Sequence, residues 1–424
     1  MEPARSAGRV FFPLDEELAL LPGQLAPRQQ NHLVHLASYM PFQTASRMME
    51  ELLEVQVSKE SARRLTQRMG DALQQAQTEA ADAPFEEEAD AALLPSRLAM
   101  SADGAMIGLV GGEWVEVRTL VLGQIAPPEK KTCTPEPRVQ EVSSFSRLVD
   151  AEGFIHLAEV ETRRRKVIQA GQVCAVMDGA QWLQEFTDVH RADAVRILDF
   201  AHAADHVSAL LEALGQQGLQ FPPKFRERCW HLLKHRGPQW MLKRLDRLPE
   251  SMQALDGIRE HVGYLRKREA QMQYRAFLKE GLPIGSGMVE SANKSVVEAR
   301  LKGAGMRWQR KNVNSMLALR NGACSDRWQA TWREATAAVL LDQQRSHQNR
   351  ADQRAQSRLG LRNPLLLTSP ALPPPPPPDP PSLPSPVPAP AKRLPGSSRP
   401  SASHPWRRPF KSGPLQAQKD AAKI

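Results

Sequence analysis

Strand-like sequence is confined to the middle of the 424-residue chain, between about residues 96 and 200, and helical patterns lie on both sides of it. Within this stretch the expected order is strand, strand, strand, helix, strand, helix, strand, helix. The pair of glycines at 111–112 marks the turn of an antiparallel hairpin, because consecutive glycines favour tight turns. This order predicts a mixed α/β fold.

Three helical patterns precede the strands, over roughly residues 28–70. Ser58 can cap the third of them, KESARRLTQRM, whose apolar residues recur at helical spacing. Its other face is basic and carries Lys59, Arg63, Arg64 and Arg68. Helix, short turn and basic helix are typical of a helix-turn-helix, whose last helix enters the major groove of DNA. We therefore expect an all-α DNA-binding domain over residues 1–72; a small helical bundle with a solvated charged face is the alternative.

The sequence after the strands is first helical and then rich in proline. Residues 222–282 are helical and basic, and helical character continues over 283–345. From residue 363 onward the chain holds 19 of its 35 prolines, six of them in a row at 373–378. Such a segment cannot contribute a core, so we expect a disordered, basic, Pro-rich tail over 346–424. A linker at 73–95 and a core segment at 96–221 complete the expected division.

The charge distribution favours a polyanionic partner. The chain carries 56 Lys and Arg against 47 Asp and Glu, a net +9, and the 8 Lys and Arg and 2 Asp from residue 363 onward account for +6 of it. Four scattered cysteines without CxxC spacing indicate neither a disulfide framework nor a cysteine zinc site. Because no apolar run is long enough to span a membrane, we expect a soluble, intracellular protein.

Three carboxylates stand where metal-dependent chemistry would need them. Asp103 in SADGAM and Asp178 in VMDGAQW each end a strand and precede Gly-Ala, and ligands of α/β sheets bind beyond such strand ends. Glu290 in PIGSGMVESANK lies near the start of a helix. Facing carboxylates repel unless a cation lies between them, and oxygen ligands suit Mg²⁺ or Mn²⁺. The alternatives are that Asp-Gly only forms turns and that Glu290 only offsets the helix dipole.

Several segments together resemble bacterial insertion-sequence transposases of the ISKra type, in the Mutator-like branch of DDE transposases. They are FFPLDEELALLPGQLAPR, PFQTASRMMEELLEVQVSKESARRLT, SADGAMIGLVGGEWVEVRTLVLG, VMDGAQWLQ, ILDFAHAADHV and PIGSGMVESANKSVVEARLKGAGMRW. The resemblance covers roughly residues 10–335. It implies a ribonuclease-H-like core interrupted by a helical insertion, here 222–282. It also implies that Asp103, Asp178 and Glu290 are the catalytic, metal-binding triad, with gaps of 75 and 112 residues between them.

The resemblance further implies a reaction and its partners. Two Mg²⁺ or Mn²⁺ ions would serve hydrolysis at the end of the element, and the freed 3′-hydroxyl would then attack target DNA. The expected partners are double-stranded DNA, both terminal repeats and target, and further copies of the chain in a DNA-bound homo-oligomer. The expected location is the bacterial cytoplasm, at the nucleoid when the protein is bound to DNA. Two alternatives stay open: an inactive, domesticated DNA-binding regulator, and a ribonuclease-H-like nuclease without strand transfer.

Two further groups of residues are candidates for contact with DNA. The resemblance extends to Asp199 and His202 in ILDFAHAADHV, for which we expect a role in supporting the metal ligands or in contacting DNA. His206 makes an HxxxH with His202, but no further ligand pair favours zinc. A basic run follows Glu290 and fits phosphate contact: Lys294, Arg300, Lys302, Arg307, Arg310 and Lys311.

Overall fold

The structure is a computed structural model of the chain and describes residues 25–84, 94–126 and 137–362. Contacts divide the chain into one compact unit that ends at Gln356 and a second unit that begins at Ser357. Of the second unit, residues 357–362 are described and are helical, so most of the expected Pro-rich tail lies outside the described residues. Among the described residues, no helix has the length and apolar character that crossing a membrane requires.

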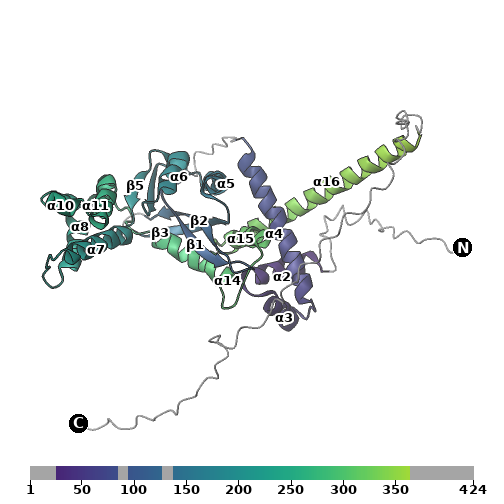
Figure 1. Ribbon diagram of the computed structural model, residues 1–424. Helices are drawn as coiled ribbons and strands as arrows, with labels where there is room; N and C mark the ends of the chain where they lie inside the picture. The colour runs from purple at the N-terminus through teal and green to yellow at the C-terminus, as the bar shows by residue number, and fades with distance from the viewer. Residues whose placement is uncertain (1–24, 85–93, 127–136, 363–424) are drawn as a thin grey trace, which may run out of the picture. The chain divides into compact units, whose positions relative to one another are not determined.

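A five-stranded mixed sheet forms the centre of the first unit (Figure 1). Its strands, in chain order, are β1 (Arg97–Gly108), β2 (Trp114–Ile125), β3 (Val139–Arg147), β4 (Gln172–Met177) and β5 (Val195–Leu198). In space the order is β3-β2-β1-β4-β5. The first three strands pair antiparallel, whereas β4 and β5 run parallel to β1. The expectation of a mixed α/β fold is confirmed.

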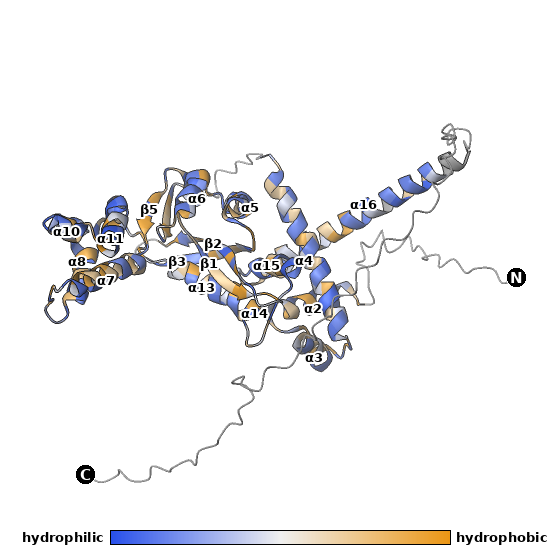
Figure 2. Ribbon diagram, in the orientation of Figure 1, coloured by the Kyte–Doolittle hydropathy of each residue, from blue (hydrophilic) through white to orange (hydrophobic). Residues whose placement is uncertain are grey.

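Helices cover both faces of the sheet, because apolar side chains alternate along its strands. On one face, Leu98 and Met100 pack with Phe154 and Phe186 of the helices α5 (Ala151–Arg164) and α6 (Gln181–Arg191). On the other face, Ile107 and its neighbours pack against four later elements. These are α13 (Gly287–Ala292), the π-helical turn η3 (Asn293–Glu298), α14 (Ala299–Leu301) and α15 (Val313–Ala323). Figure 2 shows the hydrophobic residues gathered along the strands.

A helical segment lies between β5 and α13 and packs beside the parallel end of the sheet. It follows α7 (Phe200–Gln216) and comprises α8 (Phe225–Arg236), α9 (Gln239–Leu245), α10 (Glu250–Gln253), α11 (Asp256–Lys267), the 3-10 turn η2 (Glu269–Met272) and α12 (Tyr274–Lys279). Its apolar residues Leu233, Leu265 and Tyr274 share one core with the strands β4 and β5. The segment is therefore held directly against the strand ends that carry the candidate site.

The N-terminal helices are part of the same compact unit as the sheet. They are α2 (Pro27–Tyr39), α3 (Phe42–Leu53) and α4 (Lys59–Asp82), and they pack against α15 and the start of α16 (Trp328–Arg362). The guanidinium of Arg320 donates to the carbonyls of Ser295 and Val296 in η3 and of Ser38 in α2. The hydroxyl of Tyr39 donates to the Ala323 carbonyl at 2.6 Å. The expected DNA-binding helices are thus joined to the segment that follows Glu290.

Two helices run past boundaries that the sequence suggested. α4 continues through residue 72 to Asp82, because Leu73, Gln77 and Ala81 extend its buried face toward α15 and α5. The expected linker therefore begins as helix, and its later part, 85–93, lies outside the described residues. α16 runs past residue 345 to Arg362. The coloured turns of α16 that precede its grey end are largely hydrophilic (Figure 2).

Side chains of the α15–α16 region cover the free edge of β3. The backbone N–H groups of Ser144, Ser146 and Leu148 point away from β2 at a spacing of two residues. They donate to Ser325 Oγ at 3.0 Å, Asn321 Oδ1 at 2.9 Å and Asn314 Oδ1 at 2.7 Å, respectively. An uncovered strand edge is a template for pairing with another chain, so these side chains close the sheet on this side.

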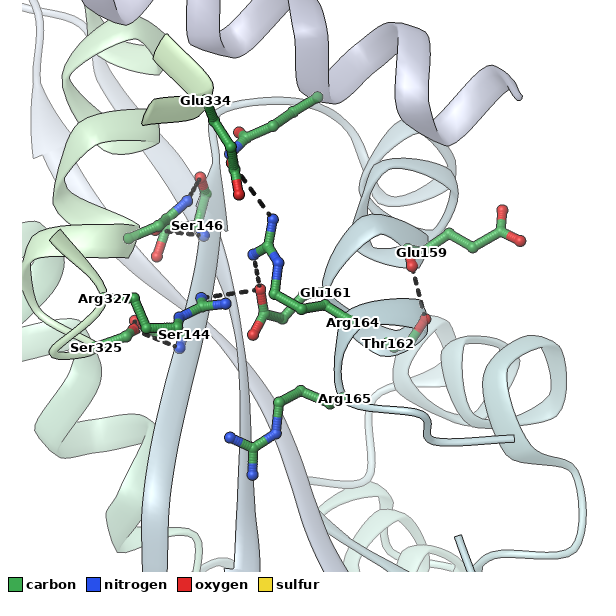
Figure 3. Close-up of polar contacts among 12 residues, drawn as sticks. Ser144, Ser146, Glu159, Glu161, Thr162, Arg164, Arg165, Ser325, Arg327 and Glu334 are labelled. Carbon is green, nitrogen blue, oxygen red and sulfur yellow. Dashed lines mark hydrogen bonds and ion pairs between the residues drawn. The ribbon is translucent and has the colours of Figure 1, made fainter. Parts of the chain in front are cut away.

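A buried glutamate locks α5 to the same region. Glu161 is fully buried, and its Oε2 accepts from Arg164 Nη1 at 2.6 Å and from Arg327 Nη2 at 3.1 Å (Figure 3). Arg164 comes from α5 itself, whereas Arg327 lies in the turn before α16. The pair of arginines therefore neutralises a charge that burial alone would make costly.

Candidate active site

Asp103, inside β1, and Asp178, directly after β4, lie level with each other on neighbouring parallel strands. The expected strand end at Asp103 is wrong, because β1 continues through the Gly-Ala pair to Gly108, where it stays paired with β2. β1 and β4 pair with a constant offset of 75 residues, from Arg97 opposite Gln172 to Met100 opposite Ala175. The same offset separates Asp103 from Asp178, which directly follows β4. Because neighbouring strands are about 4.8 Å apart, this register places the two carboxylates side by side.

The Asp103 carboxyl lies in an environment that disfavours its charge. Burial raises its pKa, and the negative charges of Asp178 and Glu116 raise it further. The N–H of Gly104 and the nearby His202 act in the opposite direction without cancelling the shift. A carboxyl whose pKa is raised by burial and like charge is a place where an added cation would be stabilised.

Glu290 sits on the helix beside Asp103, with its side chain exposed. Asn293, three residues later, donates from Nδ2 to Asp103 Oδ2 at 3.2 Å. Residues three apart share one side of a helix, so Glu290 lies one turn from the side chain that touches Asp103. Within residues 25–84, 94–126 and 137–362, no three His, Cys, Asp or Glu side chains converge closely enough to hold a metal ion as they stand. Asp103 and Asp178 are brought together, whereas Glu290 lies on the helix next to β1 without its carboxylate joining theirs.

Asp199 ties the end of β5 to the loop that precedes Glu290. Its buried carboxylate accepts the Ser286 N–H at 2.7 Å through Oδ1. Its Oδ2 accepts the backbone N–H of His202, capping α7, and lies 3.0 Å from His202 Nδ1. A backbone bond from Phe200 to the Ile284 carbonyl runs alongside. Asp199 therefore acts as a bracket between two segments of the site.

The pKa values of Asp199 and His202 depend on each other, and that of His202 also depends on Asp178 and Asp103. Burial alone would raise the pKa of Asp199, but the hydrogen bonds from His202 and Ser286 outweigh it and lower that pKa. The hydrogen bond to Asp199 raises the pKa of His202 against the effect of burial, and the charges of Asp178 and Asp103 add to the rise. The three carboxylates therefore favour the protonated form of His202.

The helical segment clamps the peptide that follows Asp178. The N–H of Gly179 donates to the Tyr264 hydroxyl oxygen at 3.1 Å, and the Arg268 guanidinium donates to the Gly179 carbonyl. A Cβ at position 179 would overlap both side chains, so glycine permits their close approach to the backbone. Asp178 itself accepts the Ala180 N–H at 2.7 Å. Sequence reasoning missed Tyr264 and Arg268, because the one signal for them was this glycine.

His206 lies away from the carboxylates. Its Nδ1 is 2.9 Å from Nδ1 of His261, and its ring stacks on Tyr264 with the centroids 3.6 Å apart. His206 of the HxxxH motif therefore contacts the helical segment. There it packs against Tyr264, whose hydroxyl binds the N–H of Gly179.

Most of the basic residues expected to contact DNA are exposed, and some of them form ion pairs with acidic side chains. Five of the run after Glu290 are exposed: Lys294, Lys302, Arg307, Arg310 and Lys311. Two of these form ion pairs, Lys302 with Glu298 and Arg310 with Glu113, both at 2.6 Å. On α4, Lys59, Arg64 and Arg68 are exposed, and Arg63 binds Glu60 at 2.5 Å.

Arg300 differs from the rest of the run because it is buried. Its Nε donates to the Ala37 carbonyl at 3.1 Å, and its guanidinium lies between the rings of Phe42 and Trp308, at 5.1 and 5.0 Å. Burial lowers the pKa of Arg300 to about 10. Its Nε is turned into the protein, so Arg300 joins α2 to α14 and does not face a phosphate.

No family model matches the chain, and no curated protein sequence matches it. What the chain does is therefore inferred from the side chains at this end of the sheet. Two level aspartates with a glutamate on the neighbouring helix, a histidine with a raised pKa, and exposed lysines and arginines suit the handling of a phosphodiester.

Proposed function

We propose that the protein is a DDE transposase, which cleaves the ends of an insertion sequence and joins them to target DNA. The observation that carries this proposal is the level placement of Asp103 and Asp178 beside the helix of Glu290. Three antiparallel strands continued by two parallel ones support a ribonuclease-H-like core. The helices of 222–282 stand where an insertion between the second aspartate and the glutamate belongs.

The proposal gives the N-terminal helices the task of holding DNA. Ser58 caps α4 by accepting the Ser61 N–H at 3.0 Å, after a short connection from α3. The exposed lysine and arginines of the first turns of α4 would enter the major groove as the second helix of a helix-turn-helix. The exposed cations after Glu290 would hold the backbone near the cut, since phosphate contacts position DNA without reading it.

Asp103, Asp178 and Glu290 would hold divalent ions, Mg²⁺ or Mn²⁺. The raised pKa of Asp103 beside a second carboxylate fits such a role, and Glu290 is exposed and accessible on the adjacent helix. When bound, the ions would supply Lewis acidity at the phosphodiester. The protein supplies orientation: Asn293 holds the Asp103 carboxylate, and the Tyr264–Arg268 clamp holds the turn of Asp178.

The test is cleavage and joining by the purified protein. The substrate is linear DNA carrying the sequences that flank its gene on both sides, incubated with Mg²⁺ or with EDTA. Wild type should nick at the ends and form joined products with Mg²⁺ alone. Asp103→Asn, Asp178→Asn and Glu290→Gln should each reduce nicking by at least about a hundredfold and leave DNA binding intact. Glu298→Gln is the matched control, because Glu298 lies on the same helical segment and pairs with Lys302.

A Glu290→Gln protein that nicks like the wild type would remove Glu290 from the triad. Nicking without joined products would favour a nuclease. The exposed position of Glu290 favours one further candidate, a regulator that binds DNA without cutting it. Binding to the flanking DNA without nicking in either Mg²⁺ or Mn²⁺ would establish that candidate.

A further inference from the structure

Asn293 is a polar residue on the face of η3 that packs against the sheet. Its neighbours on this face, Val296 and Val297, are buried and belong to the core that covers β1 and β2. Asn293 is buried as well, with 6 % of its surface exposed. Burying a carboxamide is costly unless its polar atoms are bound, so the contacts of Asn293 should indicate its role.

The two polar atoms of the Asn293 amide differ in their contacts. Nδ2 donates to Asp103 Oδ2 at 3.2 Å. Oδ1 is buried and has no hydrogen-bond partner within the part of the chain that the structure describes. A buried carbonyl oxygen without a partner is unfavourable. The side chain that contacts the first candidate metal ligand therefore carries an oxygen that can still accept a bond.

The backbone at Asn293 is also unusual. η3 is π-helical and begins at Asn293, and the N–H of Ala299 at its end donates to the carbonyl of Lys294, five residues earlier. π-helical turns are rare and frequently occur at functional sites. The extra residue in such a turn changes which side chains share a face of the helix. Here the irregular turn starts at the residue that contacts Asp103.

An amide suits a carboxylate site both without and with a cation. Without a cation, the nitrogen donates to Asp103, as the structure shows. Half a turn about the last side-chain bond exchanges the nitrogen for the oxygen, and carbonyl oxygens are ligands that Mg²⁺ and Mn²⁺ accept. An aspartate or glutamate at position 293 would instead add a negative charge beside Asp103 whenever the cation is absent.

We propose that Asn293 supplies its amide oxygen as a ligand of the divalent ion that Asp103 and Asp178 hold. This inference rests on the proposed function, because it takes a metal ion to bind at these two carboxylates. The Glu290 carboxylate does not join the aspartates, whereas the Asn293 amide already contacts one of them. The buried, unpartnered Oδ1 is the observation that carries the inference.

The first test measures Mn²⁺ binding to the full-length protein by calorimetry, without DNA, so the result does not depend on cleavage. Wild type should bind Mn²⁺, and Asn293→Ala should weaken that binding about tenfold or more. In EDTA, urea unfolding of Asn293→Ala should differ little from that of wild type. The reason is that the substitution removes one hydrogen bond and one unpartnered oxygen together.

A second variant separates a metal ligand from a residue that only orients Asp103. Asn293→Cys replaces the amide oxygen by sulfur, and soft thiolates favour soft ions such as Cd²⁺ over Mg²⁺ or Mn²⁺. This variant should bind Mn²⁺ more weakly than wild type and, with one equivalent of Cd²⁺, should gain the ultraviolet charge-transfer absorption of a sulfur–cadmium bond. Ser291→Cys is the matched control and should show neither change. Ser291 is exposed, and residues two apart on a helix do not face the same side.

Each other outcome overturns one specific statement. Wild-type Mn²⁺ affinity in Asn293→Ala would overturn the inference. Weakened Mn²⁺ binding by Asn293→Cys without the sulfur–cadmium absorption would also overturn it, because Asn293 would then only orient Asp103. Loss of Mn²⁺ binding that both variants share with loss of folding in EDTA would likewise count against a ligand. Failure of the wild type to bind Mn²⁺ would instead overturn the metal-dependent function proposed above.

Discussion

The carboxylate of Asp199 accepts the backbone N–H of Ser286 at 2.7 Å, so the start of α7 holds the loop that leads to Glu290. The two residues are 87 positions apart, and the whole helical segment lies between them. The position of the candidate catalytic glutamate therefore depends on a buried acid that need not touch the substrate.

Replacing Asp199 should damage both stability and catalysis. Asp199→Ala removes the cap of α7 and leaves the buried Ser286 N–H without its acceptor, which together should lower the free energy of unfolding by about 2–4 kcal/mol. Urea unfolding and the nicking assay measure the two effects. Asp205→Ala, at an exposed acid on the same helix, is the control and should change either quantity little. Equal effects of the two substitutions would contradict the role of Asp199 in holding the loop at Ser286.

Glu161 and Glu334 form a matched pair, because both contact Arg164. Glu161→Gln should cost about 3 kcal/mol of unfolding free energy, since it leaves Arg164 and Arg327 without their buried counter-charge. Glu334 lies 3.7 Å from Arg164 and is largely exposed, so Glu334→Gln should cost less than about 1 kcal/mol. Thermal or urea unfolding of both variants measures the difference. Similar losses of unfolding free energy would show that the larger cost does not come from the burial of Glu161.

His190 should make the protein sensitive to mild acid. Burial lowers its pKa to about 4, and its Nε2 donates to the Ile155 carbonyl at 3.0 Å. The unfolded chain takes up the proton near pH 6.5, whereas the folded chain does not, so stability is full above that pH and falls from there to about pH 4. The loss should reach about 3 kcal/mol. Urea unfolding of wild type and His190→Gln at several pH values tests this; parallel curves would exclude His190 as the source.

Gly70 and Gly263 should respond oppositely to alanine. A Cβ at Gly70 would overlap the backbone oxygen of Ser315, so Gly70→Ala must push α4 away from α15 and should destabilise by about 2–3 kcal/mol. A Cβ at Gly263 in α11 meets nothing within 4 Å, so Gly263→Ala should stabilise by about 0.5–1 kcal/mol. The melting temperatures of the two variants should move in opposite directions, and a shift of the same sign would refute the packing argument.

The sequence was sufficient for the parts of the fold that local patterns encode. Alternating apolar residues predicted the strands that carry Asp103 and precede Asp178, and the structure has both. The expected end at Asp103 was wrong, because β1 runs on to Gly108. The antiparallel hairpin of β1 and β2 followed from the glycine pair at 111–112. Such features are set by neighbours within a few residues and are therefore visible without a structure.

Other features depend on segments that meet only in the folded chain. Asn293, Tyr264 and Arg268 carry no motif, and their contacts with Asp103 and Gly179 span 85 to 190 residues. Arg300 belongs to a charged run that looks solvated, yet the rings of Phe42 and Trp308 enclose it. The exposure of Trp114 was also hidden, because a tryptophan in an alternating strand is expected to face the core.

The packing of α4 on α15 has a consequence for folding during synthesis on the ribosome. The apolar face of α4, complete by Asp82, finds its partner in residues that begin at Val313. A ribosome that adds about 5–20 residues per second needs roughly ten to fifty seconds to deliver them. During that interval Met69 and Leu73 lack the neighbours that α15 and α16 provide, so the nascent chain exposes an apolar helix face of the kind that makes folding intermediates prone to aggregate.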